Sequence, residues 1–294
     1  MYWIFEPASP TPADSAAVVF LWHGTTKVVD DDSMDVIQMH DALMRHLVRK
    51  GFTVVYPVYQ YGPYQITGGY NAQRDTCAEI MKKALNELET GAHVRPKRYA
   101  NGDMMLGSVG HSRGGKMSSS LAADYWQLGI PKIKAVYANV AFEQMATLVS
   151  IPPDTKWISM IADADTNIQH LVTVDTLIDR YCKLNSIPSG NKHILRLRSD
   201  LSGGVPVVAD HHYYECHAGD PAYTNVLDFY GSWKITTSLM QCAFFNTNCE
   251  YCLTNPDSIR YMGEWSSGAP FNLISILDDT CSMVNSLEEV DLIA

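Results

Sequence analysis

The sequence predicts an α/β protein in which helices cover both faces of a mostly parallel central sheet. Short apolar, β-branched runs such as residues 17–22 and 52–57 are typical of strands that are buried on both faces. Segments with apolar residues at helical spacing alternate with these runs along the chain. Strands that alternate with helices imply right-handed crossovers, and therefore parallel pairing.

The alternation continues over most of the chain. Strands are expected at residues 2–5, 17–22, 52–57, 104–109, 133–140, 157–162 and 193–197. Helices are expected at residues 35–50, 71–90, 113–128 and 167–184, with one or two more at 225–245. We find no linker and no internal repeat, so we expect a single domain over residues 1–294.

Composition excludes several classes of partner. The chain has 294 residues, of which 46% are hydrophobic and 18% charged, with a net charge of −10. This charge argues against binding to nucleic acid or to an anionic membrane surface. Apolar runs such as residues 16–21 are too short to span a bilayer. We see no charged leader with a cleavage site at residues 1–5, which leaves a cytoplasmic protein or a secreted one whose leader has been removed.

Seven cysteines leave the redox compartment open, and an odd count leaves at least one thiol free or paired between molecules. Cys242, Cys249 and Cys252 are close enough in sequence for one local disulfide, and the sequence does not decide whether it forms.

No metal or other cofactor is expected. The spacing of Cys249-x-x-Cys252 is that of half a structural zinc site. The histidines and cysteine at 211–217 do not have the spacing of a second half. The aspartates at 30–32 lack the glycine and glutamate of a calcium-binding loop. Neither a Walker-type loop nor the dinucleotide-binding glycine spacing occurs.

A candidate nucleophile lies at mid-chain in the segment GHSRGG, residues 110–115, between an expected strand and an expected helix. A serine hydroxyl is a weak nucleophile, and a sharp, strained strand-to-helix turn would let Ser112 protrude towards a base. Flanking glycines are needed where the backbone approaches itself closely. The N–H of Arg113 and the helix N-terminus would then face a developing oxyanion. An incidental serine in a tight turn is the less favoured interpretation.

A second oxyanion donor is expected after the strand that ends at Trp22. His23-Gly24-Thr25 follows this strand, and His-Gly often marks the loop that supplies such a donor. We assign the donor to the backbone N–H of Thr25, because acyl transfer needs two donors near one oxygen. Alone, His-Gly would indicate only a strand-ending turn.

Together, the strand ending in His-Gly, the GHSRGG segment and the strand–helix alternation resemble the α/β-hydrolase family over nearly the whole chain. The resemblance implies the α/β-hydrolase fold and a catalytic triad in the chain order serine, acid, histidine. Family members with a cap domain carry a long helical insertion where this chain has only a short segment, between residues 140 and 157. The comparison therefore implies no large cap domain and an open, shallow cleft.

The acid is expected after the strand at 157–162. The segment ADADT, residues 162–166, resembles the acid turn of lidless cutinases and polyester hydrolases, and the match places the acid at Asp165. Its role would be to hold the tautomer of the histidine and to stabilise the imidazolium. Asp163 remains the alternative acid. Either aspartate could simply cap the helix that follows.

The base is expected in the loop after the last strand, where Asp210, His211 and His212 follow one another. An Asp-His pair in this loop resembles many family members, in which the histidine directly after the aspartate is catalytic. We therefore favour His211 over His212, and the other histidine would belong to the loop or to the cleft wall.

Several side chains are expected around the cleft. The candidates for substrate contact are Trp22, His111, His212 and Tyr213, and further tyrosines on the same side are Tyr59, Tyr61, Tyr64, Tyr70 and Tyr214. An open aromatic cleft suits acyl or aromatic esters, including polyester chains. Any single one of these tyrosines could instead pack against a loop.

The sequence thus predicts a serine carboxylic-ester hydrolase that acts through an acyl-enzyme on a small-molecule or polymeric ester. An amidase or peptidase with the same triad is one alternative, and a non-catalytic binding protein with the same fold is another. The strained turn at Ser112 argues against the binding protein, because such strain has little structural use. The natural substrate, the acyl chain length and the oligomeric state are not predicted.

Overall fold

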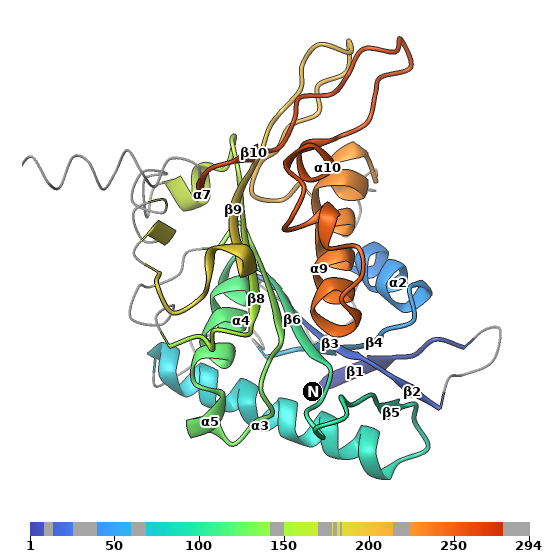
Figure 1. Ribbon diagram of the computed structural model, residues 1–294, viewed down its shortest axis with the longest axis vertical. Coiled ribbons are helices and arrows are strands. Elements are labelled where there is room, and N and C mark those ends of the chain that lie inside the picture. The colour runs from blue at the N-terminus through green and yellow to red at the C-terminus, as the bar shows by residue number, and fades with distance from the viewer. Residues whose placement is uncertain are drawn as a thin grey trace, which may run out of the picture.

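The structure is a computed structural model. It describes residues 1–8, 14–25, 40–59, 69–141, 150–169, 178, 181–182, 184–213 and 224–278. These residues form an α/β structure built on a mostly parallel central sheet (Figure 1). The predicted α/β class with a mostly parallel sheet is therefore confirmed.

The sheet has eight strands among the described residues, in the order β1-β4-β3-β6-β7-β8-β9-β10. The strands are β1 (Tyr2–Phe5), β3 (Val18–Trp22), β4 (Thr53–Pro57), β6 (Leu106–His111), β7 (Ala135–Asn139), β8 (Lys156–Ala162), β9 (Lys192–Leu197) and β10 (Ser275–Ile276). From β4 to β9 all neighbours pair in parallel, whereas β1 and β10 are antiparallel edge strands. The carboxyl ends of the parallel strands share one edge, where α/β proteins form their sites. A separate parallel pair joins β2 (Ser15–Ala16) to β5 (Arg95–Pro96).

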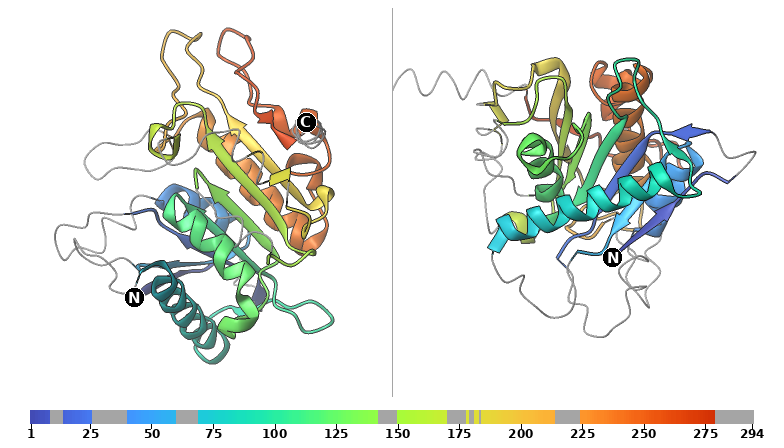
Figure 2. Two further views of the ribbon diagram at one scale, coloured as in Figure 1. Left: turned by 90° about the vertical axis from the view of Figure 1, so that its left-hand side faces the viewer. Right: turned by 90° about the horizontal axis from the view of Figure 1, so that it is seen from below.

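Helices cover both faces of the sheet, with α2 and α9 on one face and α3 and α4 on the other (Figures 1 and 2). The helices are α2 (Asp41–Arg49), α3 (Gly69–Thr90), α4 (Arg113–Ala123), α5 (Tyr125–Leu128), α7 (Thr166–Gln169), α9 (Lys234–Phe245) and α10 (Pro256–Arg260). A π-helical segment, η2 (Leu227–Trp233), precedes α9, and two short 3₁₀ segments are η1 (Ser189–Asn191) and η3 (Cys249–Tyr251).

Strand β3 shows why its sequence is a continuous apolar run. Val19 and Leu21 belong to the core beneath α2 and α9, while Val18, Phe20 and Trp22 belong to the core beneath α3 and α4. All five side chains are at most 1% exposed. Burial of each such side chain contributes roughly 1.5–3 kcal/mol. Because both faces are covered, β3 needs apolar residues at every position.

The observed elements differ from the predicted ones at several boundaries. The helix predicted over 113–128 is broken at Asp124 into α4 and α5, and the Asp124 carboxylate pairs with Arg74 of α3. Aspartate competes for backbone hydrogen bonds in helix interiors, which favours a break there. Strand β10 was not predicted, because two residues carry too little pattern. The predicted helices 35–50 and 167–184 and the predicted short, cap-free segment between β7 and β8 fall partly outside the described residues.

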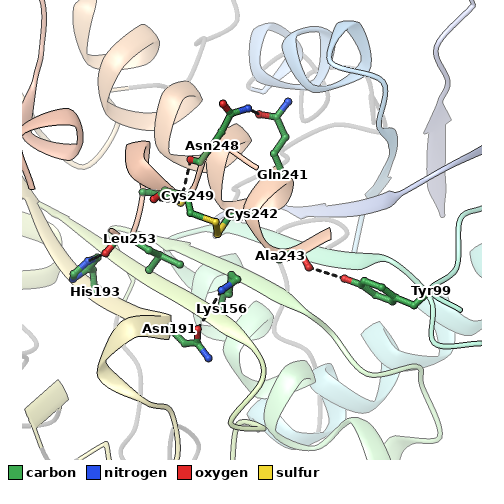
Figure 3. Close-up of a disulfide and its surroundings, with 11 residues drawn as sticks. Tyr99, Lys156, Asn191, His193, Gln241, Cys242, Ala243, Asn248, Cys249 and Leu253 are labelled. Atoms are coloured by element: carbon green, nitrogen blue, oxygen red, sulfur yellow. Dashed lines mark hydrogen bonds between the residues drawn. A yellow bond between two sulfur atoms is a disulfide. The ribbon is translucent and has the colours of Figure 1, made fainter. Parts of the chain in front are cut away.

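A disulfide joins Cys242 of α9 to Cys249 of η3 (Figure 3). Of the cluster that the sequence left open, Cys252 is the free member, and burial raises the pKa of its thiol to about 12. Cys182 is also disulfide-bonded. In the described ranges we find no group of three or more His, Cys, Asp or Glu side chains placed to hold a metal ion. No helix in that part of the chain has both the length and the apolar character needed to cross a bilayer.

Candidate active site

Ser112 occupies a strained turn between β6 and α4. Its backbone has φ 52° and ψ −118°, a region that non-glycine residues seldom adopt. The Ser112 N–H donates to the Asn139 carbonyl at 2.8 Å, and the Ser112 carbonyl accepts the N–H of Gly115 at 3.0 Å. The turn is therefore tied to β7 on one side and to the first turn of α4 on the other. Strain of this kind persists where the surroundings hold it, and such positions cluster at functional sites.

The glycines around Ser112 are required by close backbone contacts. A Cβ at Gly110 would lie 2.1 Å from the Gly114 carbonyl oxygen. A Cβ at Gly114 would lie 2.1 Å from the Trp22 carbonyl oxygen of β3. Real Cβ atoms do not approach other atoms this closely, so glycine lets α4 begin directly against β6 and β3. This is the geometric reason for the G-x-S-x-G pattern.

The predicted oxyanion segment lies beside Ser112, the candidate nucleophile. A Cβ at Gly24 would lie 3.3 Å from the Ser112 Cβ, so the His23-Gly24 loop meets the turn at Ser112. Thr25, the next residue, is exposed at this edge. The two predicted donors, the backbone N–H groups of Thr25 and Arg113, therefore come from segments that converge on Ser112. The start of α4 adds the positive end of a helix dipole at the same place.

The structure brings the predicted triad together. The Nε2 atom of His211 lies 2.9 Å from the Oγ of Ser112, and its Nδ1 lies 2.8 Å from the Oδ2 of Asp165. Because a carboxylate accepts, Nδ1 carries a proton, and in the neutral ring Nε2 accepts the hydroxyl proton of Ser112. His211 is 7% exposed and Asp165 2% exposed. Such burial strengthens the hydrogen bonds along this chain of three groups.

The two candidate acids have separate partners. Asp165 contacts His211 through Oδ2, and its Oδ1 accepts the N–H of Asn167 at the start of α7. Asp163 instead accepts the hydroxyl of Ser199 at 2.6 Å and the Ser199 N–H at 3.0 Å. Asp163 therefore ties the end of β8 to the segment after β9. Of the two aspartates, Asp165 is the one that reaches the imidazole.

The neighbouring histidines take different places. His212, the alternative base, is exposed, and its ring stands edge-on to His211 at 5.1 Å between centroids. The backbone N–H of His212 donates to the Asp210 carboxylate, and this bond stabilises the turn. His111 is 1% exposed, and its Nε2 lies 2.7 Å from the His211 carbonyl oxygen. His211 is thus the histidine that faces Ser112.

Sequence reasoning missed a buried link between the turn at Ser112 and the histidine loop. The Tyr213 hydroxyl lies 2.9 Å from both the Asn139 Oδ1 and the Ser232 Oγ. Asn139 also accepts the Ser112 N–H through its carbonyl. One residue of β7 therefore contacts both the backbone of Ser112 and the loop that carries His211. In the sequence, the only indication of this link was that Asn139 lies at the carboxyl end of β7, the strand next to β6.

Three side chains predicted at the cleft are buried, which corrects that prediction. Trp22 is 0% exposed and donates from its indole to the Ser108 hydroxyl within the core. Tyr213 is 8% exposed because its hydroxyl serves the buried link to Asn139. His111 is buried against His211. Of the four candidates, only His212 presents its side chain to solvent.

The further tyrosines do not build an aromatic cleft either. Tyr59 is 7% exposed and donates to the His23 carbonyl, and Tyr70 is half-buried with its hydroxyl at 2.9 Å from the Ser120 Oγ. Tyr61, Tyr64 and Tyr214 lie outside the described residues. The aromatic side chains therefore give no support to a particular ester.

An open cavity of about 640 Å³ lies away from the triad. Its aromatic lining residues are Phe229, Tyr230, Trp233, Tyr251 and Tyr261, from η2, η3 and the end of α10. None of the triad residues lines it. This cavity is therefore no part of the site built around Ser112.

Comparison with known proteins adds no family assignment. No protein-family model matches the chain, and no curated protein matches it. What can be said of its chemistry therefore rests on the arrangement of Ser112, His211 and Asp165.

Proposed function

We propose that the chain is a serine hydrolase of the α/β-hydrolase fold that cleaves carboxylic esters through an acyl-enzyme. Ser112 would be the nucleophile, His211 the general base and Asp165 the triad acid. The observation that carries the proposal is the unbroken chain of hydrogen bonds from the Ser112 Oγ through the imidazole to the buried carboxylate, at 2.9 and 2.8 Å. This is the recurring arrangement of nucleophilic catalysis by serine.

The first half of the reaction follows from these contacts. As the Ser112 Oγ bonds to the ester carbonyl carbon, its proton passes to the Nε2 of His211. Asp165 stabilises the imidazolium and holds its orientation. The negative charge on the former carbonyl oxygen faces the N–H groups of Thr25 and Arg113. When the bond to the leaving alcohol breaks, that alcohol takes the proton from Nε2.

The second half repeats these roles with water. His211 takes a proton from a water molecule as the water oxygen attacks the acyl-enzyme carbonyl. The bond to the Ser112 Oγ then breaks, the proton returns to that oxygen, and the carboxylic acid leaves. The strained backbone at Ser112 supports this assignment, since a merely structural serine would not need φ 52°.

We propose no substrate class narrower than carboxylic esters. The sequence favoured acyl or aromatic esters and polyester chains because aromatic residues were expected at the cleft. Trp22, Tyr59 and Tyr213 are instead buried. Polyester therefore enters as one arm of the substrate test rather than as the proposed substrate.

A fluorophosphonate probe tests the nucleophile directly. We expect it to label the native wild type on Ser112, mapped by peptide mass, and to leave heat-unfolded protein and Ser112→Ala unlabelled. Ser189→Ala, at an exposed serine in η1, is the matched control and should label like the wild type. Absence of labelling on native Ser112 would favour a non-catalytic binding protein.

Matched substrates then test the reaction class. We expect nitrophenyl esters of graded chain length to be hydrolysed, and anilides of the same acyl groups to be hydrolysed far more slowly. Ser112→Ala should lower turnover roughly 10⁴-fold or more. Preference for the anilides would identify an amidase. A soluble polyester oligomer, included in the same panel, would show whether long chains enter the site.

A further inference from the structure

His111 contacts the backbone of the proposed base. It is the last residue of β6 and directly precedes Ser112. Since a carbonyl oxygen only accepts, the His111 Nε2 carries a proton and donates it to the His211 carbonyl at 2.7 Å. Because His111 is only 1% exposed, this hydrogen bond is shielded from water. Loss of the donor would leave a buried carbonyl unsatisfied, which is costly.

The same imidazole contacts the loop of the second oxyanion donor. A Cβ at Gly24 would lie 2.7 Å from the His111 Nδ1, so that loop packs directly against the ring. On another side, the ring centroids of His111 and His211 are 4.8 Å apart. His111 thus touches the His23-Gly24 loop and the histidine loop, and it is itself part of the turn at Ser112. All three proposed parts of the site meet at this one side chain.

We propose that His111 is a positioning residue that holds His211 in register with Ser112 and Asp165. The proposal rests on the hydrolase function proposed above. His211 lies in a turn rather than in a strand, so its backbone direction depends on contacts such as the one from His111. Restraining the His211 carbonyl restrains the backbone from which its Cα–Cβ bond projects. Both ring nitrogens can then make their bonds of 2.9 and 2.8 Å at the same time.

Three substitutions at position 111 separate the hydrogen bond from the bulk of the side chain. His111→Leu removes the donor but keeps most of the volume. His111→Gln places an amide N–H near the position of the imidazole Nε2, and His111→Asn carries the same group on a shorter chain. We expect kcat per folded enzyme to fall roughly a hundredfold in the Leu and Asn variants with KM little changed. The Gln variant should recover to within severalfold of the wild type.

A control comes from another histidine that also contacts a backbone carbonyl. The Nε2 of His193 donates to the Leu253 carbonyl at 2.9 Å (Figure 3). Its Nδ1 lies 2.6 Å from the Asp278 Oδ2. His193 is near the start of β9, away from the carboxyl edge that carries the triad. His193→Leu should lower the melting temperature but leave kcat per folded enzyme unchanged. Full kcat in His111→Leu and His111→Asn, or a Gln variant as slow as Leu, would overturn the positioning role.

A measurement that needs no turnover keeps this test independent of the proposed function. In protein labelled with ¹⁵N-histidine, the Nδ1 proton bound to Asp165 should give a strongly downfield resonance, assigned by its loss in His211→Ala. We expect it to broaden or vanish in His111→Leu and to persist in His111→Gln and in His193→Leu. An unchanged resonance in the Leu variant would refute the role of His111. Failure to cleave any ester would instead refute the hydrolase, while the resonance still reports on His111.

Discussion

The Oδ2 of Asp165 lies 2.8 Å from the Nδ1 of His211, while the other oxygen of the same carboxylate accepts the Asn167 N–H at the start of α7. The two interpretations of an aspartate in this turn, triad acid and helix cap, are therefore both satisfied by one residue. The cap restrains the carboxylate, and the restrained carboxylate orients the imidazole. Asp163, two residues earlier, is bound to Ser199 instead.

Substitution of the two aspartates should therefore have different effects. We expect Asp165→Asn to lower kcat roughly a thousandfold or more, because the amide no longer selects the tautomer with a proton on Nδ1. Asp163→Asn should weaken the bonds to Ser199 and lower stability by about 1–3 kcal/mol. Its kcat per folded enzyme should stay within about tenfold of the wild type, as expected for a residue outside the triad. Ester hydrolysis with urea unfolding checks both, and the reverse order of effects on kcat would make Asp163 the acid.

Gly114 offers a test of the turn geometry. A Cβ there would lie 2.1 Å from the Trp22 carbonyl oxygen, so Gly114→Ala must push α4 away from β3. Overpacking of this kind costs about 1–3 kcal/mol, and displacement of Ser112 from His211 should lower kcat/KM roughly a hundredfold. Gly190→Ala is the control, because a Cβ at Gly190 meets nothing within 4 Å. Equal stability and activity of the two variants would contradict the contact with β3.

The elements that the sequence predicted well are those that are buried on both faces or strongly periodic. Strands β3 and β4 each begin one residue late, and they were recognisable because a strand covered on both faces must be apolar throughout. The edge strand β1, which is only partly buried, also matches its predicted bounds. Strands β2, β5 and β10 were missed, since two residues make no pattern. The π-helical segment η2 was not separated from α9, because it runs directly into α9 with no turn residue between them.

For the candidate site, the sequence predicted which three side chains would meet, because the proposed chemistry dictates residue type and order. Ser112, Asp165 and His211 could be picked out since a nucleophile, a base and an acid have few substitutes and follow known strands. The prediction failed for Trp22 and Tyr213, which are aromatic residues near the site but are buried in the core. Hydropathy does not tell a side chain that lines a cleft from one that lies beneath it.

The Tyr213 hydroxyl gives a further prediction. Tyr213→Phe removes its contacts of 2.9 Å with Asn139 and Ser232, and it leaves buried polar atoms without this partner. We expect a loss of stability of about 1–3 kcal/mol. Because Asn139 also holds the Ser112 N–H, we expect kcat to fall roughly tenfold as well.

A second tyrosine provides the comparison for that variant. The Tyr99 hydroxyl donates to the Ala243 carbonyl at 2.7 Å (Figure 3), a contact in which no triad residue takes part. Tyr99→Phe should lose stability in the same range without a change in kcat per folded enzyme. If both variants keep the wild-type kcat, the link through Asn139 serves the fold alone.

His46 should also make the folded protein less stable as the pH falls. Burial, followed by the nearby charges of Lys50 and Arg49, lowers the pKa of His46 to about 4 from its usual 6.5. Its Nε2 contacts the Thr237 hydroxyl at 2.8 Å, and its ring stacks on Trp233. Below about pH 6.5 the His46 imidazole is protonated in the unfolded chain but stays neutral in the folded protein. The stability that neutral His46 contributes is therefore lost as the pH falls from about 6.5 to about 4.

A pair of histidine variants tests this decline by melting temperature, measured from acidic to mildly alkaline pH. His46→Gln cannot titrate, so its melting temperature should fall less steeply than that of the wild type as the pH drops. His93→Gln should differ from the wild type above about pH 6.5, because the hydrogen bond that the His93 imidazole donates to the Glu6 carboxylate, with further attraction to Glu6 and Glu87 that outweighs burial, raises the pKa of His93. The stability that His93 contributes is present at low pH and is lost as the pH rises through its raised pKa. Below about pH 6.5 the His93→Gln curve should therefore run parallel to that of the wild type, and a His46→Gln curve that also ran parallel there would show that His46 does not govern the acid decline.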